Sequence, residues 1–129
     1  MREKAKKWLE FAGMDIKRAE RGAEFDDWED ALDHLQQAVE KSLKALLVLK
    51  NSEIPRTHRI DVLLKVLKDL GFKIEQDILS AQILTQYIFT TRYPDDYVPV
   101  SKEEYEEAYE IALKVYKWAK GIIEGSALE

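Results

Sequence analysis

Apolar residues recur at intervals of three and four through most of the chain, and this period indicates helices packed lengthwise against one another. The clearest example is the stretch 26–49, which runs for about six helical turns without Gly or Pro. Its seam consists of the apolar Trp28, Leu32, Leu35, Val39 and Leu46 and of the polar Ser42. A seam of this spacing is typical of a long helix in an antiparallel four-helix bundle.

Ala31, Ala38 and Ala45 form a second apolar line beside that seam, and their small side chains would let a neighbouring backbone come close. Together with Tyr105, Trp118 and Ile122 of the last predicted helix, they provide more apolar surface than a small bundle needs. An apolar stripe left unused inside the bundle tends to become an interface, so we expect a homodimer.

The same period predicts a helix at each end of the chain. The first runs from about residue 2 to 21 and is closed by Gly22. The last follows a capping box made by Ser101 and Glu104 and reaches about residue 124.

Two more helices are predicted between these segments. A short one spans 58–70, with Thr57 as its N-cap and Gly71 as its end. The next spans 74–90, with Ile78, Ala81, Leu84, Tyr87 and Ile88 on its buried side. Pro94 prevents this helix from continuing.

No segment alternates with the period of two that marks a strand. The predicted fold is therefore all-α, an up-and-down antiparallel four-helix bundle with one additional short helix. Residues 1–129 form one domain, which is large enough to bury a core. The closing Leu128 and Glu129 could be a cloning remnant, and no structural role is assigned to them.

Composition narrows the classes of function. The chain has no Cys, so it has no disulfide framework, thiol nucleophile or cysteine metal site. Its net charge of −5 argues against broad binding of nucleic-acid phosphates, although a local basic patch could exist. No apolar run reaches the length of a membrane span, and the charged N-terminus is unlike a secretory signal. We therefore expect a cytoplasmic protein that does not bind membranes.

The residues that several common catalytic and metal-binding sites require are absent from the sequence. The sequence contains no Gly-rich phosphate loop, no HExxH and no Glu-x-x-His pair of the kind that di-iron bundles use. His34 and His58 are the only histidines. No metal site and no cofactor are predicted.

Two polar residues of the long helices, Asp15 and His34, are expected to be ordinary surface residues. Asp15 lies at the edge of the first apolar stripe and is expected to be an exposed or rim carboxylate, because Asp is rarely buried. The alternative is an inward-leaning Asp15 paired with a cation from a neighbouring helix. His34 lies off the seam of its helix and is expected to face solvent.

His58 and Arg92 are open to two interpretations each. His58 opens a helix, either as a capping or packing residue or as part of a polar pocket with Arg92. Arg92 lies where the fourth helix breaks, and it could pair with Asp95 or cap that helix. An Arg beside an aromatic residue, here Tyr93, also suits a phosphate or a stacked base.

Four stretches, in order, are similar to one family across nearly the whole chain. They are Ala12-x-x-Asp15-Ile16-x-x-Ala19, Gln37-Ala38-Val39-Glu40-Lys41-x-x-Lys44-Ala45-Leu46-Leu47, Thr57-His58-x-Ile60-x-x-Leu63-Leu64 and Arg92-Tyr93-Pro94-Asp95. The second and the last are the specific ones. Together they resemble the HEPN family, the higher eukaryotes and prokaryotes nucleotide-binding domain.

The resemblance implies a bundle of four or five helices that usually forms a homodimer. Such domains are often encoded beside, or fused to, a minimal nucleotidyltransferase, as a toxin–antitoxin or nucleotide-modifying pair. Many members are metal-independent RNases that use an Arg and a His separated by a spacer of four to six residues. Arg92 matches that Arg, but Tyr97, Val98 and Pro99 occupy the positions where the His would stand. The general acid–base of the family is therefore missing, which disfavours RNase activity.

The sequence thus predicts a non-enzymatic, HEPN-like module that binds a nucleotide or substrate and acts as partner of a minimal nucleotidyltransferase. The predicted ligand-binding residues are Lys41, Lys44, His58, Arg92 and Tyr93, and the residues that could organise them are Asp15, Glu40 and Asp95. Topology is expected to bring Lys44, His58 and Arg92 to one end of the molecule. The alternatives are an RNase toxin in which Arg92 and His58 are catalytic, and a ligand-free dimerisation scaffold.

Overall fold

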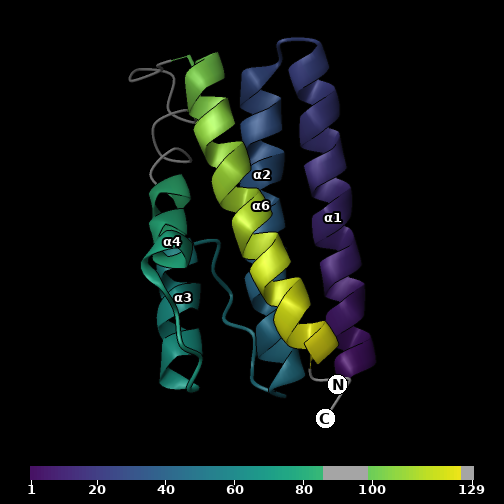
Figure 1. The fold of residues 1–129 in the computed structure, drawn as a ribbon, viewed down its shortest axis with the longest axis vertical. Helices are drawn as coiled ribbons and strands as arrows, with labels where there is room; N and C mark the ends of the chain where they lie inside the picture. The colour runs from purple at the N-terminus through teal and green to yellow at the C-terminus, as the bar shows by residue number, and fades with distance from the viewer. Residues whose placement is uncertain (86–98, 126–129) are drawn as a thin grey trace.

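Three long helices form the body of the computed structural model, which describes residues 1–85 and 99–125 (Figure 1). They are α1 (Arg2–Glu24), α2 (Trp28–Leu49) and α6 (Lys102–Gly125). The ring centroids of Trp28 and Tyr105 lie 5.4 Å apart, so α2 and α6 begin side by side and run in the same direction. Tyr109, near the start of α6, donates a 2.5 Å hydrogen bond to Glu20 near the end of α1. Helix α1 therefore runs antiparallel to both.

The hairpin between α1 and α2 differs from the prediction at Gly22. Helix α1 passes through Gly22 and ends at Glu24. A Cβ on Gly22 would lie 3.4 Å from the Cβ of Ala31, about van der Waals contact, so the two helices lie close together here. The chain turns at Asp26, whose φ is 57°, and the carboxylate of Asp27 accepts a 3.3 Å hydrogen bond from the Asp30 amide to cap α2.

The predicted capping box at the start of α6 is confirmed. The Glu104 amide donates to Ser101 Oγ at 3.1 Å, and the Ser101 amide donates to Glu104 Oε1 at 3.3 Å. This local pair starts the helix without help from the rest of the fold.

The short helix α3 (Ile60–Asp69) begins two residues later than predicted, because its cap comes from elsewhere. Thr57 is not the N-cap, since its Oγ1 accepts from the Arg59 amide within the loop. The Ile60 amide instead donates a 3.0 Å hydrogen bond to Thr85 Oγ1, which lies 25 residues further along the chain. Gly71 follows the helix with a φ of +100°, as expected of a glycine at a helix end.

The segment before α3 returns along α2, so α3 runs in the same direction as the second half of α2 (Figure 1). His58 contacts Glu40 in the middle of α2, whereas Phe72, after α3, lies under Lys50 Nζ at 5.5 Å from the ring centroid. The expectation that Lys44 and His58 lie at one end of the molecule is wrong, because this segment carries His58 back to the middle of the bundle.

The fourth helix was predicted to be continuous from 74, but it begins at α4 (Gln76–Leu79) and passes through a 3₁₀ turn, η1 (Ser80–Gln82). Helical backbone resumes at 83–85. Ile78, Ala81 and Leu84 are buried as predicted, whereas the predicted core positions at 87 and 88 lie outside the described residues. The buried amide of Gln36 donates a 2.6 Å hydrogen bond to the Leu84 carbonyl, which ties this irregular stretch to α2.

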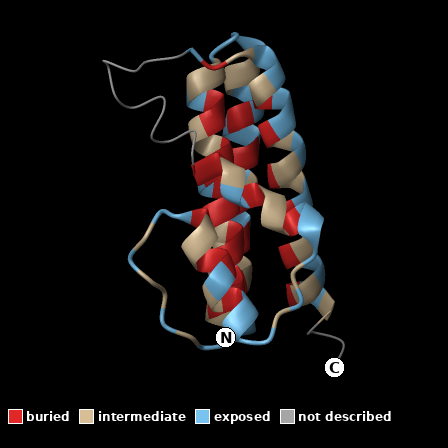
Figure 2. Ribbon diagram, turned by 90° about the vertical axis from the view of Figure 1, so that its left-hand side faces the viewer, coloured by how far each residue is buried: buried red, intermediate tan, exposed pale blue. Residues whose placement is uncertain are grey.

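The buried side chains form one core along the length of the bundle (Figure 2). Leu35, Leu43, Leu46, Leu63 and Val115 are completely enclosed. The all-helical class is confirmed, and the structure assigns no strand within residues 1–85 and 99–125. In this part of the chain, none of the helices combines the length and the apolarity of a membrane span.

The alanine line of α2 cannot supply a dimer interface, and this part of the sequence argument is wrong. Ala31, Ala38 and Ala45 are fully buried against other elements of the same chain. In α6, Ile123 is buried and Ile122 packs partly against the core of the same chain.

Candidate functional site

A cleft of about 340 Å³ opens beside α2, between the first half of α1 and the segment that precedes α3. We call it the α2 cleft. It is lined by Trp8, Asp33, Gln36, Gln37, Glu40, Lys41, Lys44 and His58. Four residues predicted for the site, Glu40, Lys41, Lys44 and His58, therefore border one concave surface.

Glu40 and His58 form a polar pair across the α2 cleft. His58 Nδ1 lies 3.1 Å from Glu40 Oε2, and the two side chains are 85% and 8% exposed, His58 being the open one. Burial raises the pKa of Glu40 above its ordinary value, and the opposing effects of His58 and Lys44 do not overcome it. The carboxyl group thus takes up a proton more readily than an exposed glutamate.

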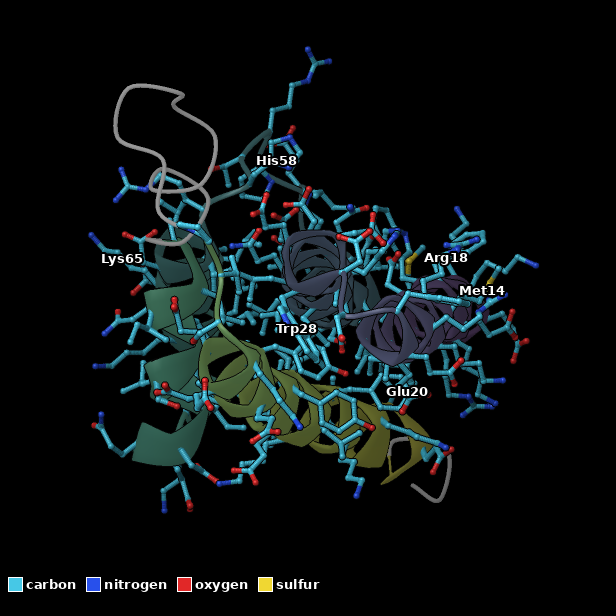
Figure 3. The ribbon with its side chains drawn as sticks, turned by 90° about the horizontal axis from the view of Figure 1, so that it is seen from above. Met14, Arg18, Glu20, Trp28, His58 and Lys65 are labelled. Atoms are coloured by element: carbon cyan, nitrogen blue, oxygen red, sulfur yellow. The ribbon has the colours of Figure 1, made fainter. Side chains whose placement is uncertain are left out.

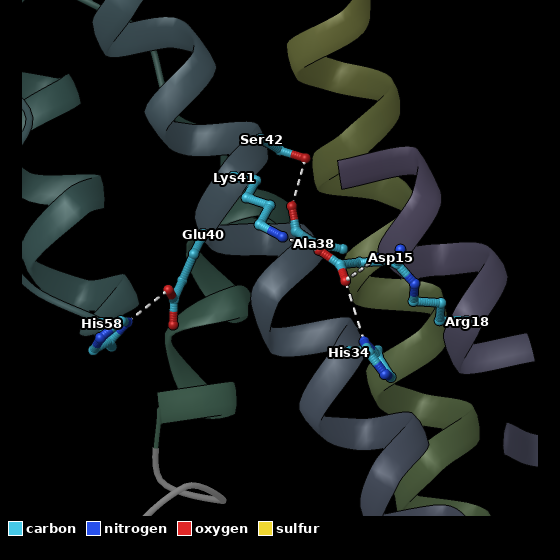
Figure 4. A network of polar contacts seen from close by, with 8 residues as sticks. All are labelled: Asp15, Arg18, His34, Ala38, Glu40, Lys41, Ser42 and His58. Atoms are coloured by element: carbon cyan, nitrogen blue, oxygen red, sulfur yellow. Dashed lines mark hydrogen bonds and ion pairs between the residues drawn. The ribbon is translucent and has the colours of Figure 1, made fainter. Parts of the chain in front are cut away.

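Asp15 is the centre of a second polar cluster, between α1 and α2 (Figure 4). Its side chain is only 1% exposed, so the prediction of a rim carboxylate is wrong and the alternative, a pair with a cation of a neighbouring helix, is what the structure contains. Lys41 Nζ donates to Asp15 Oδ2 at 2.6 Å, and Arg18 lies 3.5 Å from Oδ1. The close approach of α1 to the alanine line of α2 allows this contact.

His34 belongs to the same cluster. Its Nδ1 lies 3.1 Å from Asp15 Oδ1, and its Nε2 lies 3.7 Å from Asp30. The side chain is 23% exposed, so the expectation of a solvent-facing His34 is wrong. Position along α2 alone did not reveal that α1 covers one side of this ring.

The two lysines of the α2 cleft have different surroundings. Lys41 is held by Asp15, whereas no ion pair joins Lys44 to a described residue. Lys44 and the exposed ring of His58 can therefore meet an anionic group that enters from solvent. Lys41 also lines the cleft, and its Nζ is oriented by Asp15.

Arg92, Tyr93 and Asp95 lie outside the described residues, so their positions relative to the α2 cleft stay predictions. Within residues 1–85 and 99–125, no three His, Asp or Glu side chains are placed to hold a metal ion.

Four residues of the α2 cleft were not predicted for the site: Trp8, Asp33, Gln36 and Gln37. Gln37, Lys41 and Lys44 repeat in steps of four and three, and this polar line beside the apolar seam was a usable signal. Trp8 had been assigned only to the apolar stripe of the first helix. Nothing near Trp8 in the sequence indicates that part of its ring borders a polar cleft of another helix.

Comparison with protein families assigns the chain. The HEPN domain model matches residues 5–122, nearly the whole sequence. The chain belongs to the HEPN domain family.

Two solved structures are similar to this HEPN domain. Protein TT1696 from Thermus thermophilus has 28% sequence identity and a TM-score of 0.80, over 90% of this chain and 95% of its own. ST0689, an archaeal HEPN homologue, has 27% identity and a TM-score of 0.75, over 92% of this chain and 97% of its own. No functionally curated protein matches the chain.

Proposed function

We propose that this HEPN domain is a cytoplasmic binding module that holds a nucleotide in the α2 cleft and acts as partner of a minimal nucleotidyltransferase. The observation that carries the proposal is the grouping of Lys41, Lys44 and His58 around one cleft of a chain whose net charge is −5. The cleft also contains Asp33 and Glu40, so an anion would bind through direct contacts with Lys44 and His58 and not through a net positive charge of the site.

The cleft suits a mononucleotide in size and in chemistry. Its volume of about 340 Å³ is at the lower end of the range for small-molecule sites. Lys44 and His58 would bind the phosphate through charge-assisted hydrogen bonds, and the part-buried Trp8 would offer its ring to the base. Asp15 would act as a positioning residue that orients Lys41, which lines the cleft.

Titration with AMP and ATP, followed by NMR of the labelled protein, tests this site. We expect weak binding whose shifts centre on the α2 cleft, and a loss of at least tenfold in affinity in Lys44→Ala, which on the general scale is about 1.4 kcal/mol. Lys65→Ala, a lysine on the exposed side of α3, is the matched control and should bind as the wild type does. Unchanged affinity in Lys44→Ala would move the site away from the α2 cleft.

The partner and the oligomeric state are proposed from the family. A minimal nucleotidyltransferase from the same genome, co-expressed with this chain, should purify with it in a stoichiometric complex, as expected of a toxin–antitoxin-type pair. Light scattering of the isolated domain should give twice the 15.0 kDa mass of one chain. A 15.0 kDa species at micromolar concentration would contradict the homodimer, and separate elution would contradict the pair.

The absence of His at positions 97–99 argues against the RNase alternative. We therefore expect the purified protein to leave single-stranded RNA intact. RNA cleavage that disappears in both Arg92→Ala and His58→Ala would replace the binding module with an RNase that uses these two residues.

A further inference from the structure

The outward side of α1 carries a line of residues that the proposed nucleotide site does not use. Its members recur in steps of three and four and are all exposed: Lys4, Lys7, Phe11, Met14, Arg18 and Arg21. We call this line the α1 ridge. Two apolar side chains occupy its centre and two cations lie toward each end.

The centre of the α1 ridge is apolar surface that the bundle leaves uncovered. Phe11 and Met14 are 45% and 44% exposed. Figure 3 shows Met14 and Arg18 on the side of α1 that points away from the other helices. Exposed Phe and Met side by side, with Arg close by, have the composition of residues that dominate protein–protein interfaces.

The cations of the ridge are largely available. Lys4 and Arg21 make no ion pair with a described residue, whereas Lys7 has an exposed contact of 3.9 Å with Glu10 and lies over the Phe11 ring, 5.9 Å from its centroid. Arg18 makes a 3.5 Å contact with Asp15 and keeps 45% of its side chain exposed. The ridge therefore presents up to four positive charges on a protein whose net charge is −5.

A second copy of this chain does not fit the α1 ridge. An antiparallel pair centred on Phe11 and Met14 would place Lys7 against Arg18 and Lys4 against Arg21. A parallel pair would place each cation against its own copy. Like charges at such spacing are destabilising in both arrangements, so the ridge selects a different partner.

Negative groups next to the ridge also bear on the partner. Glu3, Glu10 and Glu24 are exposed on the side of α1 next to the ridge, where the exposed Lys17 lies among them. A nucleic-acid backbone or an anionic membrane surface would meet these carboxylates as well as the cations. A helix with a narrow acidic and apolar line can contact the ridge alone.

We propose that the α1 ridge docks an amphipathic helix of another protein, with apolar residues at its centre and acidic residues toward both ends. At 1.5 Å per residue the ridge extends for about 25 Å, so the partner helix needs about 18 residues. Phe11 and Met14 pack into its apolar line, and the cations pair with its carboxylates.

The far end of the ridge adds an anchor for this helix. Arg18 and Arg21 border a cleft of about 420 Å³ at the turn between α1 and α2, which is also lined by Asp27, Asp30 and Phe25, the last of which is 82% exposed. An apolar side chain of the partner helix can enter here beside Phe25. This docking does not depend on the nucleotide site, because none of the ridge residues lines the α2 cleft.

The test uses a synthetic helical peptide of about 18 residues, with a leucine pair at its centre and glutamates toward both ends. A matched peptide carries lysines in place of the glutamates. By fluorescence anisotropy with the full chain, the glutamate peptide should bind at least tenfold more tightly than the lysine peptide. The double variant Lys4→Glu/Arg21→Glu should reverse this preference, and Phe11→Ala/Met14→Ala should weaken both peptides.

Lys17→Glu is the control variant, since Lys17 is an exposed lysine of α1 that lies off the ridge. It should bind the glutamate peptide as the wild type does, and circular dichroism should show that every variant is folded. Equal affinity for the two peptides would overturn the proposal. So would binding of anionic vesicles or single-stranded RNA that Lys4→Glu/Arg21→Glu abolishes, or a homodimer that Phe11→Ala/Met14→Ala dissociates.

Discussion

Two carboxylates of this domain are buried to nearly the same extent, yet their surroundings differ. Asp15 has Lys41, His34 and Arg18 within 3.5 Å of its oxygens. Glu40 has one direct partner, the exposed His58, and burial raises its pKa. Two carboxyl groups with similar burial can therefore have very different numbers of polar partners, because the neighbouring helix supplies these partners to Asp15 and not to Glu40.

Truncation of an apolar core side chain is expected to have the largest effect on the stability of the domain. Leu35 is fully enclosed in α2, so Leu35→Ala should lower the free energy of unfolding by about 2–5 kcal/mol. Urea denaturation measures the loss. The same change at the exposed Leu70 removes no core packing and should cost far less; equal losses would mean that α2 is rotated relative to the structure.

Removing the charge of Asp15 should have the next largest effect. Asp15→Asn keeps the shape of the side chain but weakens its contacts with Lys41 and His34, and should cost about 1.5–3 kcal/mol. Chemical denaturation at neutral pH gives the value. Glu10→Gln, an exposed carboxylate of the same helix, is the control and should leave the melting temperature unchanged. A stable Asp15→Asn would mean that the cluster contributes nothing net.

His34 and His58 each contact a buried carboxylate but differ in exposure, and removing them is expected to change the stability by smaller amounts. His34→Ala removes one of the partners of Asp15 while Lys41 and Arg18 remain, so we expect a loss of about 0.5–1.5 kcal/mol. His58 also contacts a buried carboxylate, but its ring is almost entirely in solvent, and His58→Ala should melt close to the wild type. Thermal melts of both variants measure this difference in stability. Identical shifts of the melting temperature would mean that the exposure of a histidine does not determine its contribution to stability.

The smallest effect is the pH dependence that Glu40 contributes. Because its pKa is raised in the folded state, the folded protein holds this proton more tightly than the unfolded chain. The resulting stability is complete below the ordinary pKa and is lost as the pH rises through the raised value. Glu40→Gln should therefore gain stability relative to the wild type as the pH rises from about 4 to about 8. Urea midpoints at several pH values measure this difference, and a constant difference would show that burial does not perturb Glu40.

The helices and their core sides could be predicted from the sequence because the interactions that start and orient them are local. The capping box of Ser101 and Glu104 involves residues three positions apart, and Gly71 needs only its own left-handed backbone. The apolar seam of α2 follows from the helical period, which places Leu35 and Leu46 inward whatever the neighbour is. The grouping of Lys41 and Lys44 on one side of α2 follows for the same reason.

The burial of the polar residues was decided only by the tertiary structure. Asp15 becomes the partner of Lys41, 26 residues away, because α1 crosses α2 at one rotation and one register that no local pattern encodes. The cap of α3 comes from Thr85, and His58 reaches Glu40 because the preceding segment turns back along α2. Each of these contacts joins segments distant in sequence. The periodicity of a single helix tells which side faces inward, but the charge that it meets there belongs to another helix.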